Sequence, residues 1–179
     1  MVVKHRFIVF EGIDGSGKTS LAKEFAKRIH GFYYHSPSSF ISPLRYLADV
    51  SPLRIKYHYY RLSHRIAALE IRHLLRKTDV VCDRYMYTTV AYHDVLLKKE
   101  LGLQRILVPD KIVFVSAGWK EIKRRLSKRG AKIRLEYIPY LRKVQKRYGL
   151  IFSKMDNVIR FDTTGKRVSD VVESLLKKI

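Results

Sequence analysis

Short apolar segments alternate with segments of helical periodicity along the whole chain. Runs rich in β-branched and aromatic residues predict five strands, at 6–11, 31–35, 79–83, 111–117 and 157–161. Between them, apolar residues recur every three or four positions, as helices require. These helical stretches are 21–29, 66–75, 119–126, 137–148 and 168–179. The alternation predicts an α/β fold with a mostly parallel five-stranded sheet, helices on both faces and strands buried on both sides.

Length and composition favour one domain, 1–179. A chain of 179 residues that is 46% hydrophobic has enough apolar material for a core. Its longest apolar runs, such as 7–10 and 112–115, are far shorter than the roughly 20 residues of a membrane span, so no membrane contact is expected. The charged N-terminus does not resemble a secretory signal. The single cysteine, Cys82, is expected to be packed inside, and we predict a cytoplasmic location.

The strong positive charge points to an anionic ligand without naming one. The chain has 37 Lys and Arg against 16 Asp and Glu, a formal net charge of +21. Such a field attracts nucleotides, nucleic acid, acidic partners or anionic lipid. The charge is concentrated in 120–147, where twelve Lys or Arg residues stand against Glu121 and Glu136. A solvated helical face is the alternative interpretation of such a run.

The loop after the first predicted strand carries the most specific motif in the sequence. GIDGSGKT, at 12–19, matches the phosphate-loop pattern GxxxxGK[ST] in full, and an amphipathic helix follows it. Glycines let the backbone turn its N–H groups toward phosphate oxygens, Lys18 adds a positive charge, and the Thr19 hydroxyl is placed to ligate Mg²⁺. The predicted ATP-binding residues of this loop are Gly12, Ile13, Asp14, Gly15, Ser16, Gly17, Lys18 and Thr19.

A second strand end carries an aspartate and an arginine side by side. The apolar run at 79–83 ends in Asp83, and Arg84 follows directly. An aspartate in this position anchors magnesium or its water, and the adjacent arginine can clamp a phosphate with two parallel hydrogen bonds. A plain ion pair is the alternative for these two residues taken alone. The phosphate loop elsewhere in the chain favours the functional interpretation.

Four segments of the sequence resemble the thymidylate kinases, within the P-loop nucleoside monophosphate kinases. FEGIDGSGKTS is similar to the family's opening FEGxxGxGKTT, and DRYMYTTVAYH, at 83–93, resembles DRYxxSxxAYQ. KRGAKIRLE, at 128–136, is similar to the lid pattern RGxxxRxE, and Arg65 in LSHRIA resembles the arginine of an FxxxR helix. The resemblance covers nearly the whole chain. It implies a P-loop NTPase fold with a short lid at about 129–137.

The resemblance also implies roles on the donor side of the reaction. Lys18 and the loop amides would hold the ATP phosphates, and Arg134 and Arg129 of the lid would reach over them. Mg²⁺ is the implied metal, organised by Thr19, Asp83 and Glu11. The residues implied to act in phosphoryl transfer are Lys18, Arg84, Arg134 and Asp83. They work by positioning and charge stabilisation, so no general base is required.

The acceptor side carries departures from the family pattern. The implied acceptor-binding residues are Glu11, Pro37, Arg61, Arg65, Arg84, Thr88, Tyr92 and His93. Arg61 stands where the family has a base-stacking phenylalanine, and Tyr59 or Tyr60 is the alternative aromatic for that role. His93 replaces a glutamine that binds the base, so thymine selectivity is less firmly indicated than kinase activity.

These matches predict an enzyme that transfers a phosphoryl group from MgATP to dTMP. A kinase of another or of several nucleoside monophosphates is the nearer alternative. A nucleic-acid-binding P-loop ATPase is the more distant one, supported by the net charge but by no recognition motif. The family analogy further implies a homodimer.

Overall fold

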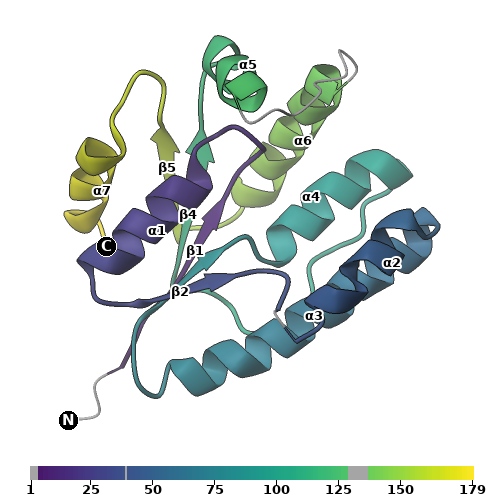
Figure 1. Ribbon diagram of the computed structural model, residues 1–179, viewed down its shortest axis with the longest axis horizontal. Helices are drawn as coiled ribbons and strands as arrows, with labels where there is room; N and C mark the ends of the chain where they lie inside the picture. The colour runs from purple at the N-terminus through teal and green to yellow at the C-terminus, as the bar shows by residue number, and fades with distance from the viewer. Residues whose placement is uncertain (1–3, 39, 129–136) are drawn as a thin grey trace.

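The computed structural model describes residues 4–38, 40–128 and 137–179. A five-stranded parallel sheet with the strand order β2-β3-β1-β4-β5 forms its centre (Figure 1). The strands are β1 Phe7–Glu11, β2 Phe32–His35, β3 Val80–Asp83, β4 Lys111–Ser116 and β5 Val158–Asp162. The order places β1 between β3 and β4, so the loops that follow these three strands meet at one edge of the sheet. The predicted α/β fold is confirmed.

Helices connect the strands and cover both faces of the sheet (Figure 1). In the described ranges they are α1 Lys18–Arg28, α2 Arg45–Val50, α3 Leu53–Leu74, α4 Met86–Leu97, α5 Trp119–Lys128, α6 Tyr137–Phe152 and α7 Val168–Leu176. None of the helices in this part of the chain is long and apolar enough to cross a membrane. Parallel strands need such crossover connections, because a short hairpin joins only antiparallel neighbours.

Side-chain alternation along the strands builds two separate apolar layers. Phe7 and Val9 of β1 face one layer, which also holds buried residues of α3, α4, α5 and α6. Ile8 and Phe10 face the other layer, built with α1 and α7. Successive side chains of a strand point to opposite faces of the sheet. A strand that contributes to both layers therefore needs apolar residues at every position. Cys82 belongs to the first layer and is fully buried, as expected.

The predicted elements differ from the structure in three details. The edge strands β2 and β5 are not buried on both sides: Phe32 is 45% exposed, and β5 has no buried residue. Each edge strand has a neighbour on one side only, so solvent reaches it from the other. The sequence also gave no indication of the short 3₁₀ turn Ser42–Leu44 or of α2. Helix α3 begins at Leu53, well before the periodic stretch that predicted it.

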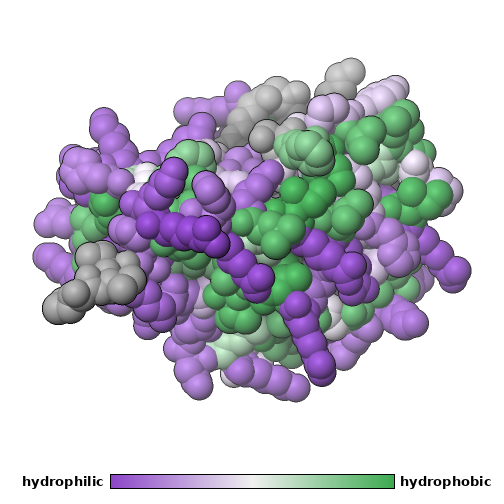
Figure 2. Space-filling model, turned by 90° about the horizontal axis from the view of Figure 1, so that it is seen from below, coloured by the Kyte–Doolittle hydropathy of each residue, from purple (hydrophilic) through white to green (hydrophobic). Residues whose placement is uncertain are grey.

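The outer face of α3 carries apolar side chains that contact solvent. Ile55, Leu62 and Leu69 are 56%, 50% and 65% exposed, and their seven-residue spacing puts them on one side of the helix. Figure 2 looks at the molecule from the side on which α3 lies and shows apolar side chains gathered in the middle of that face. The homodimer stays a prediction, for which this face offers the apolar surface.

Candidate active site

The phosphate loop connects β1 to α1 at the carboxyl edge of the sheet. Gly12 has φ 150°, and a Cβ at this position would lie 2.3 Å from the main-chain oxygen of Val115. Gly17 has φ 93° and immediately precedes the first residue of α1, Lys18. A side chain would strain the backbone at both glycines. The loop therefore turns tightly and delivers the N-terminus of α1, with its unpaired N–H groups, to the site.

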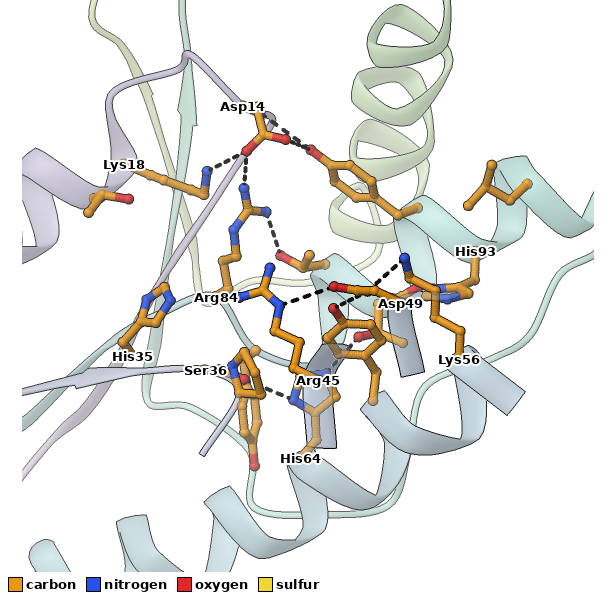
Figure 3. Close-up of a pocket in the computed structure, with 18 of the residues that line it drawn as sticks. Asp14, Lys18, His35, Ser36, Arg45, Asp49, Lys56, His64, Arg84 and His93 are labelled. Atoms are coloured by element: carbon orange, nitrogen blue, oxygen red, sulfur yellow. Dashed lines mark hydrogen bonds and ion pairs between the residues drawn. The ribbon is translucent and has the colours of Figure 1, made fainter. Parts of the chain in front are cut away.

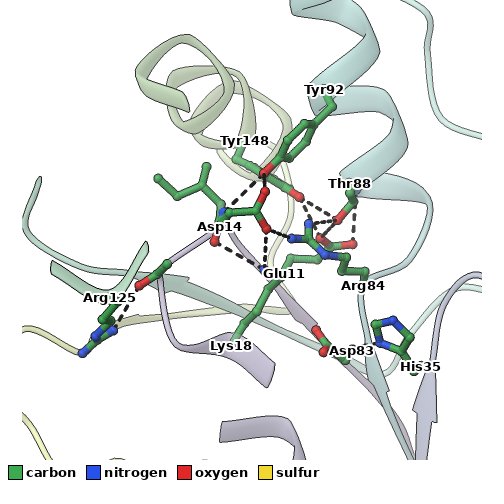
Figure 4. A network of polar contacts seen from close by, with 12 residues as sticks. Glu11, Asp14, Lys18, His35, Asp83, Arg84, Thr88, Tyr92, Arg125 and Tyr148 are labelled. Carbon is green, nitrogen blue, oxygen red and sulfur yellow. Dashed lines mark hydrogen bonds and ion pairs between the residues drawn. The ribbon is translucent and has the colours of Figure 1, made fainter. Parts of the chain in front are cut away.

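One carboxylate, Asp14, holds the two cations of the site together (Figure 4). Its Oδ1 accepts a hydrogen bond from the Arg84 guanidinium and lies 3.7 Å from Lys18 Nζ. Lys18 Nζ also donates to the carbonyl oxygen of Ile13, at 3.3 Å. Arg84 has φ 72°, a left-handed conformation that is unusual outside glycine. Such strain is maintained only where the surroundings fix the residue, and here it aims the guanidinium at the phosphate loop.

Two tyrosine hydroxyls complete the surroundings of Asp14. Tyr137 donates to Oδ2 at 2.7 Å, and Tyr92 donates to the same oxygen at 3.3 Å. Burial disfavours the charged carboxylate, but Arg84, Lys18 and these hydroxyls lower the pKa of Asp14 to about 2. Burial and the neighbouring Arg84 lower the pKa of Lys18 to about 8, so its ammonium is still mostly charged at pH 7. The site thus presents two desolvated positive charges.

Asp83 and Thr19 supply oxygen atoms of the kind that Mg²⁺ requires. Asp83 is fully buried, and its Oδ2 accepts a hydrogen bond from Tyr33 at 3.1 Å and lies 3.5 Å from His35 Nδ1. Burial raises the pKa of Asp83, but His35, Lys18 and Thr19 outweigh it and lower the pKa to about 2. Asp83 Oδ1 has no hydrogen-bond partner among the described residues. An ionised carboxylate oxygen without a partner, next to a hydroxyl, fits a magnesium site completed by phosphate oxygens and water.

Glu11 lies in a different place from the one expected for a metal or acceptor ligand. It is fully buried at the end of β1 and is not among the residues that line the acceptor cavity described below. Its oxygens accept hydrogen bonds from the main-chain N–H groups of Tyr85 and Thr88, from the Thr88 hydroxyl at 2.5 Å and from Tyr148 at 2.9 Å. These four hydrogen bonds satisfy the Glu11 carboxylate. Glu11 therefore connects the start of α4 to β1 and supports Arg84 on the side away from the cavity. Burial raises its pKa.

A cavity of about 550 Å³ opens beside these groups (Figure 3). Its walls come from the phosphate loop, from the segment after β2, and from α2, α3, α4 and α6. The lining residues are Asp14, Lys18, Thr19, His35, Ser36, Pro37, Arg45, Asp49, Lys56, Tyr60, His64, Arg84, Tyr85, Thr88, Thr89, Tyr92, His93, Leu96, Tyr137 and Tyr140. Of the residues predicted to bind the acceptor, Pro37, Arg84, Thr88, Tyr92 and His93 meet there.

Arg61 and Arg65 do not reach this cavity, in contrast to the expectation from the FxxxR pattern. Arg65 is exposed, and the Arg61 guanidinium lies 5.5 Å from the centre of the Tyr57 ring. Tyr60 and His64 occupy the inward positions instead. Successive residues of an α-helix are rotated by about 100° around its axis. A shift of one position in the sequence therefore turns a side chain away from the face that lines the cavity. The tyrosine that α3 contributes to the cavity is therefore Tyr60, and His64 stands where an arginine was expected.

His64 is held in the wall of the cavity by two hydroxyl groups. Its Nε2 lies 2.7 Å from Thr89 Oγ1 and its Nδ1 lies 3.3 Å from Ser36 Oγ. The side chain is 2% exposed. Burial, with a smaller contribution from the nearby His93, lowers the pKa of His64 to about 3. The ring is therefore uncharged throughout the physiological range.

We expect the free energy of unfolding to fall as the pH is lowered from 6.5 to 5.5. His64 stays neutral in the folded protein but is protonated in the unfolded chain, so its contribution is complete above about pH 6.5 and is lost toward pH 3. The loss approaches about 1.4 kcal/mol per pH unit below the pKa of the unfolded chain.

Urea denaturation at pH 7.5, 6.5 and 5.5 measures this loss. The variant His64→Gln should show a weaker pH dependence, whereas the exposed control His58→Gln should behave as wild type; equal slopes for His64→Gln and wild type would contradict the assignment.

A second cavity, of about 340 Å³, lies beside the phosphate loop. Arg125 of α5 joins its two sides: one guanidinium nitrogen donates to the main-chain oxygen of Ser16 at 3.0 Å, and the other donates to that of Thr163 at 3.0 Å. Arg125 Nε also donates to Glu121, at 2.6 Å. The residues that line this cavity are Gly17, Ser20, Leu21, Glu121, Arg124, Arg125, Lys128, Thr163, Lys166, Val168 and Val171. Arg125 therefore fixes the phosphate loop to the segment after β5.

Sequence reasoning missed several of these residues. Thr163 lies in DTTG, at 162–165, at the carboxyl end of β5, and loops at the carboxyl ends of parallel strands are where ligands bind. That rule applied to DTTG would have indicated Thr163. Arg125 is one of twelve cations at 120–147, and the sequence does not distinguish it from the others. The lid residues Arg129 and Arg134 lie outside the described residues. Ile13 and Ser16 are buried and shape the loop, with Ser16 N donating to Ile13 O at 3.3 Å.

The strand order, the phosphate loop and the position of the site define a P-loop NTPase fold. A family model described as thymidylate kinase matches residues 10–175. A probable thymidylate kinase of Methanocaldococcus jannaschii is 35% identical over 98% of this chain and 96% of that one. A thymidylate kinase of Leptospira interrogans is 29% identical over 96% and 92% of the two chains.

A solved structure agrees with the fold. The thymidylate kinase from Candida albicans superimposes with a TM-score of 0.79 at 21% identity, covering 98% of this chain and 91% of that one. From the family model and the relative with 35% identity, the chain belongs to the thymidylate kinase family. It is a nucleoside monophosphate kinase.

Proposed function

We propose that the protein acts in the cytoplasm and transfers the γ-phosphoryl group of MgATP to dTMP, forming dTDP and ADP. The observation that carries this proposal is the convergence of Lys18 and Arg84, from two different loops, on the single carboxylate of Asp14. We assign Lys18 to the ATP side of the site and Arg84 to the acceptor side, so two polyanionic substrates can meet between the two cations. The names of the relatives support dTMP as the acceptor.

The acceptor phosphate is assigned to Arg84. Its guanidinium lines the cavity, is held from behind by the Glu11 network, and presents two nitrogens that hydrogen-bond Asp14 and Thr88. A planar guanidinium binds phosphate oxygens with two parallel hydrogen bonds. The Tyr92 ring lies 5.8 Å from the Arg84 guanidinium and continues the cavity wall beyond it, where the sugar of the acceptor follows its phosphate.

The ATP phosphates are assigned to the phosphate loop, with Lys18 and the N-terminus of α1 as the positive groups. The second cavity adjoins Gly17 on the other side of this loop, and we assign it to the nucleoside part of ATP. Arg125 then has two functions, since it lines that cavity and keeps the loop in place. The two cavities give each nucleotide its own entrance, and their phosphates meet at the loop between them.

Thr19 and Asp83 are the groups assigned to hold Mg²⁺, because they bring a hydroxyl and an unpartnered carboxylate oxygen together. When bound there, Mg²⁺ would supply positive charge that counters the negative charge of the transferring phosphoryl group. The described residues contain no group of three or more His, Cys, Asp or Glu side chains suited to a metal.

No observation favours the other classes weighed for the sequence. The residues that line the acceptor cavity include cations, carboxylates, tyrosines and two neutral histidines, a mixture that suits a nucleotide rather than a uniform polyanion. Basic residues do surround the second cavity, but they adjoin the phosphate loop. A nucleic-acid ATPase therefore has only the net charge in its support.

Coupled ADP release with MgATP tests the proposal directly. We expect dTMP to give the highest kcat/KM in a panel with dUMP, dCMP, UMP, CMP, AMP, GMP and thymidine. Thymidine lacks the phosphate that Arg84 is assigned to bind, so it should react at less than about one thousandth of the dTMP rate. A preference for thymidine, or turnover stimulated by nucleic acid instead of by any monophosphate, would overturn the assignment.

A further inference from the structure

The segment between β2 and α3 forms part of the wall of the acceptor cavity. We call residues 36–38 and 40–50, which include the turn Ser42–Leu44 and α2, the connecting segment. The residues with which it lines the cavity are Ser36, Pro37, Arg45 and Asp49. Figure 3 shows three of them, Ser36, Arg45 and Asp49, in that wall. The shape of the cavity therefore depends on where the connecting segment lies.

Apolar burial does little to fix the connecting segment. Among its described residues, only Ile41 and Ala48 are buried apolar residues. Its other large apolar side chains are exposed, and these are Phe40, Leu44, Tyr46, Leu47 and Val50. Burial of apolar surface is the dominant favourable contribution to a fold, so a segment with so little of it needs other contacts to keep its position.

Polar contacts with α3 hold the connecting segment. The Tyr59 hydroxyl donates a hydrogen bond to the main-chain oxygen of Ile41 at 2.9 Å. Further along, Lys56 Nζ lies 2.7 Å from Asp49 Oδ1. These two contacts fix the middle of the segment and its end near α3. The start of the segment, next to β2, is held by Glu70 of α3.

Glu70 binds the chain on both sides of the cavity-lining residues Ser36 and Pro37. Its Oε2 accepts a hydrogen bond from the Tyr34 hydroxyl on β2, and its Oε1 accepts one from Ser38 Oγ at 2.8 Å. Hydrogen bonds to an ionised carboxylate are stronger than those between neutral groups. Within the part of the chain that the structure describes, the Glu70 carboxylate has no other hydrogen bond or ion pair, so it acts on these two hydroxyls alone.

Ser38 transmits this constraint to the turn that follows. The side chain of Ser38 is fully buried, and its Oγ accepts a hydrogen bond from the N–H group of Phe40 at 3.2 Å. Its main-chain oxygen accepts hydrogen bonds from the N–H groups of Ile41 at 3.2 Å and Ser42 at 3.0 Å. The turn leads directly into α2. The position of Ser38 therefore determines how the chain enters α2.

We propose that Glu70 is a positioning residue for the acceptor: it holds the connecting segment against α3 and so sets the shape of the acceptor cavity without contacting the nucleotide. This inference rests on the proposed function. Glu70 is not among the residues that line the cavity. The contacts that hold the phosphate loop through Arg125 do not involve the connecting segment. Loss of the Glu70 carboxylate should therefore weaken acceptor binding and spare the donor side.

Steady-state kinetics of Glu70→Met test this role, because methionine keeps the length of the side chain but is only a weak hydrogen-bond acceptor. We expect the KM for dTMP to rise by about tenfold, with kcat and the KM for ATP within about threefold of wild type. Glu70→Gln still accepts a hydrogen bond from one hydroxyl and can donate one to the other. It should therefore keep the KM for dTMP within about threefold of wild type. The matched control Glu173→Met, exposed on α7, should leave both KM values within about twofold.

A second variant, Ser38→Ala, keeps the inference testable if Glu70→Met folds poorly. It removes the hydroxyl through which Glu70 reaches the connecting segment, so the KM for dTMP should rise by at least about threefold while the KM for ATP stays unchanged. If the two residues act as one unit, the double variant Ser38→Ala/Glu70→Met should be no more impaired than Glu70→Met.

Hydrogen exchange without any nucleotide measures the connecting segment directly. In Glu70→Met, the N–H groups of Phe40, Ile41 and Ser42 should exchange about tenfold faster than in wild type, because their acceptor residue Ser38 is no longer held. The N–H groups of β1 should keep their wild-type rates. A change spread equally over the whole domain would instead mean general destabilisation and would contradict the positioning role.

The kinetic outcomes separate the two levels of the argument. Equal rises in the KM values for dTMP and ATP, or a Glu70→Gln protein as impaired as Glu70→Met, would overturn the inference. If the wild-type protein does not phosphorylate dTMP, the proposed function fails, and hydrogen exchange still tests the contact between Glu70 and the connecting segment. If it does phosphorylate dTMP but Glu70→Met leaves the KM for dTMP unchanged, only the role of Glu70 is wrong.

Discussion

Replacement of Lys18 by methionine is expected to lower kcat/KM by about 10³-fold while the domain stays folded. Methionine has nearly the length of lysine and fits a buried position, but it carries no charge. The lost ammonium is the one that the phosphate loop holds 3.7 Å from Asp14 and 3.3 Å from the Ile13 carbonyl, in a desolvated place where a charge acts strongly on phosphate. Asp14 keeps Arg84 and two tyrosine hydroxyls as partners, so the fold retains its contacts.

Steady-state kinetics with MgATP and dTMP, together with thermal unfolding, measure this effect. Lys27→Met, on the exposed side of the same helix, is the matched control and should leave kcat/KM within about twofold of wild type, as for a surface substitution away from the site. A Lys18→Met protein with kcat/KM within tenfold of wild type would refute the role of Lys18.

The second large effect is expected at Arg84. The change Arg84→Met should reduce kcat/KM for dTMP by about 10³-fold, because the guanidinium is assigned to the acceptor phosphate and to the charge that develops in transfer. Arg84→Lys should recover part of this loss, since it restores the charge but not the two parallel hydrogen bonds. Both variants share the left-handed backbone at this position, so the difference between them isolates the head group.

Arg65→Met is the informative control for Arg84, because the family pattern assigns Arg65 to the acceptor while the structure leaves it exposed on α3. Its KM for dTMP should stay close to the wild-type value. A large rise in that KM would show that Arg65, and not His64, faces the acceptor. An Arg84→Met protein that bound dTMP as tightly as wild type would remove the phosphate clamp from the mechanism.

The sequence predicted the strands well, and the roles given to the residues of the phosphate loop stay predictions. Each strand is a short apolar run, and its boundaries in the structure agree with the run to within a residue or two. Lys18 and Thr19 begin α1 after the loop that follows β1, Asp83 is the last residue of β3, and Arg84 follows it directly. The parallel sheet brings such segments to one edge, so their meeting follows from the order of elements alone.

The base end of the acceptor cavity was much harder to predict. In KYHYYRLSHRIA, aromatic and positively charged residues occupy both faces of the helix, so periodicity does not tell which side turns inward. Burial of Tyr57, His64, Ala67 and Ile71 fixes the rotation of α3, and this depends on contacts with α4 and the sheet that are distant in sequence. The short α2, between two Ser-Pro pairs, has no periodic signal of its own.

The shared carboxylate of Asp14 has a thermodynamic consequence for the two substrates. We assign Lys18 to the donor phosphates and Arg84 to the acceptor phosphate, and both side chains interact with the same oxygen, Asp14 Oδ1. A nucleotide that draws one cation away from Asp14 changes the strength of the interaction between the carboxylate and the other cation. The two binding events are therefore energetically linked. Linkage is reciprocal: the factor by which bound ATP alters the dissociation constant of dTMP is the factor by which dTMP alters that of ATP.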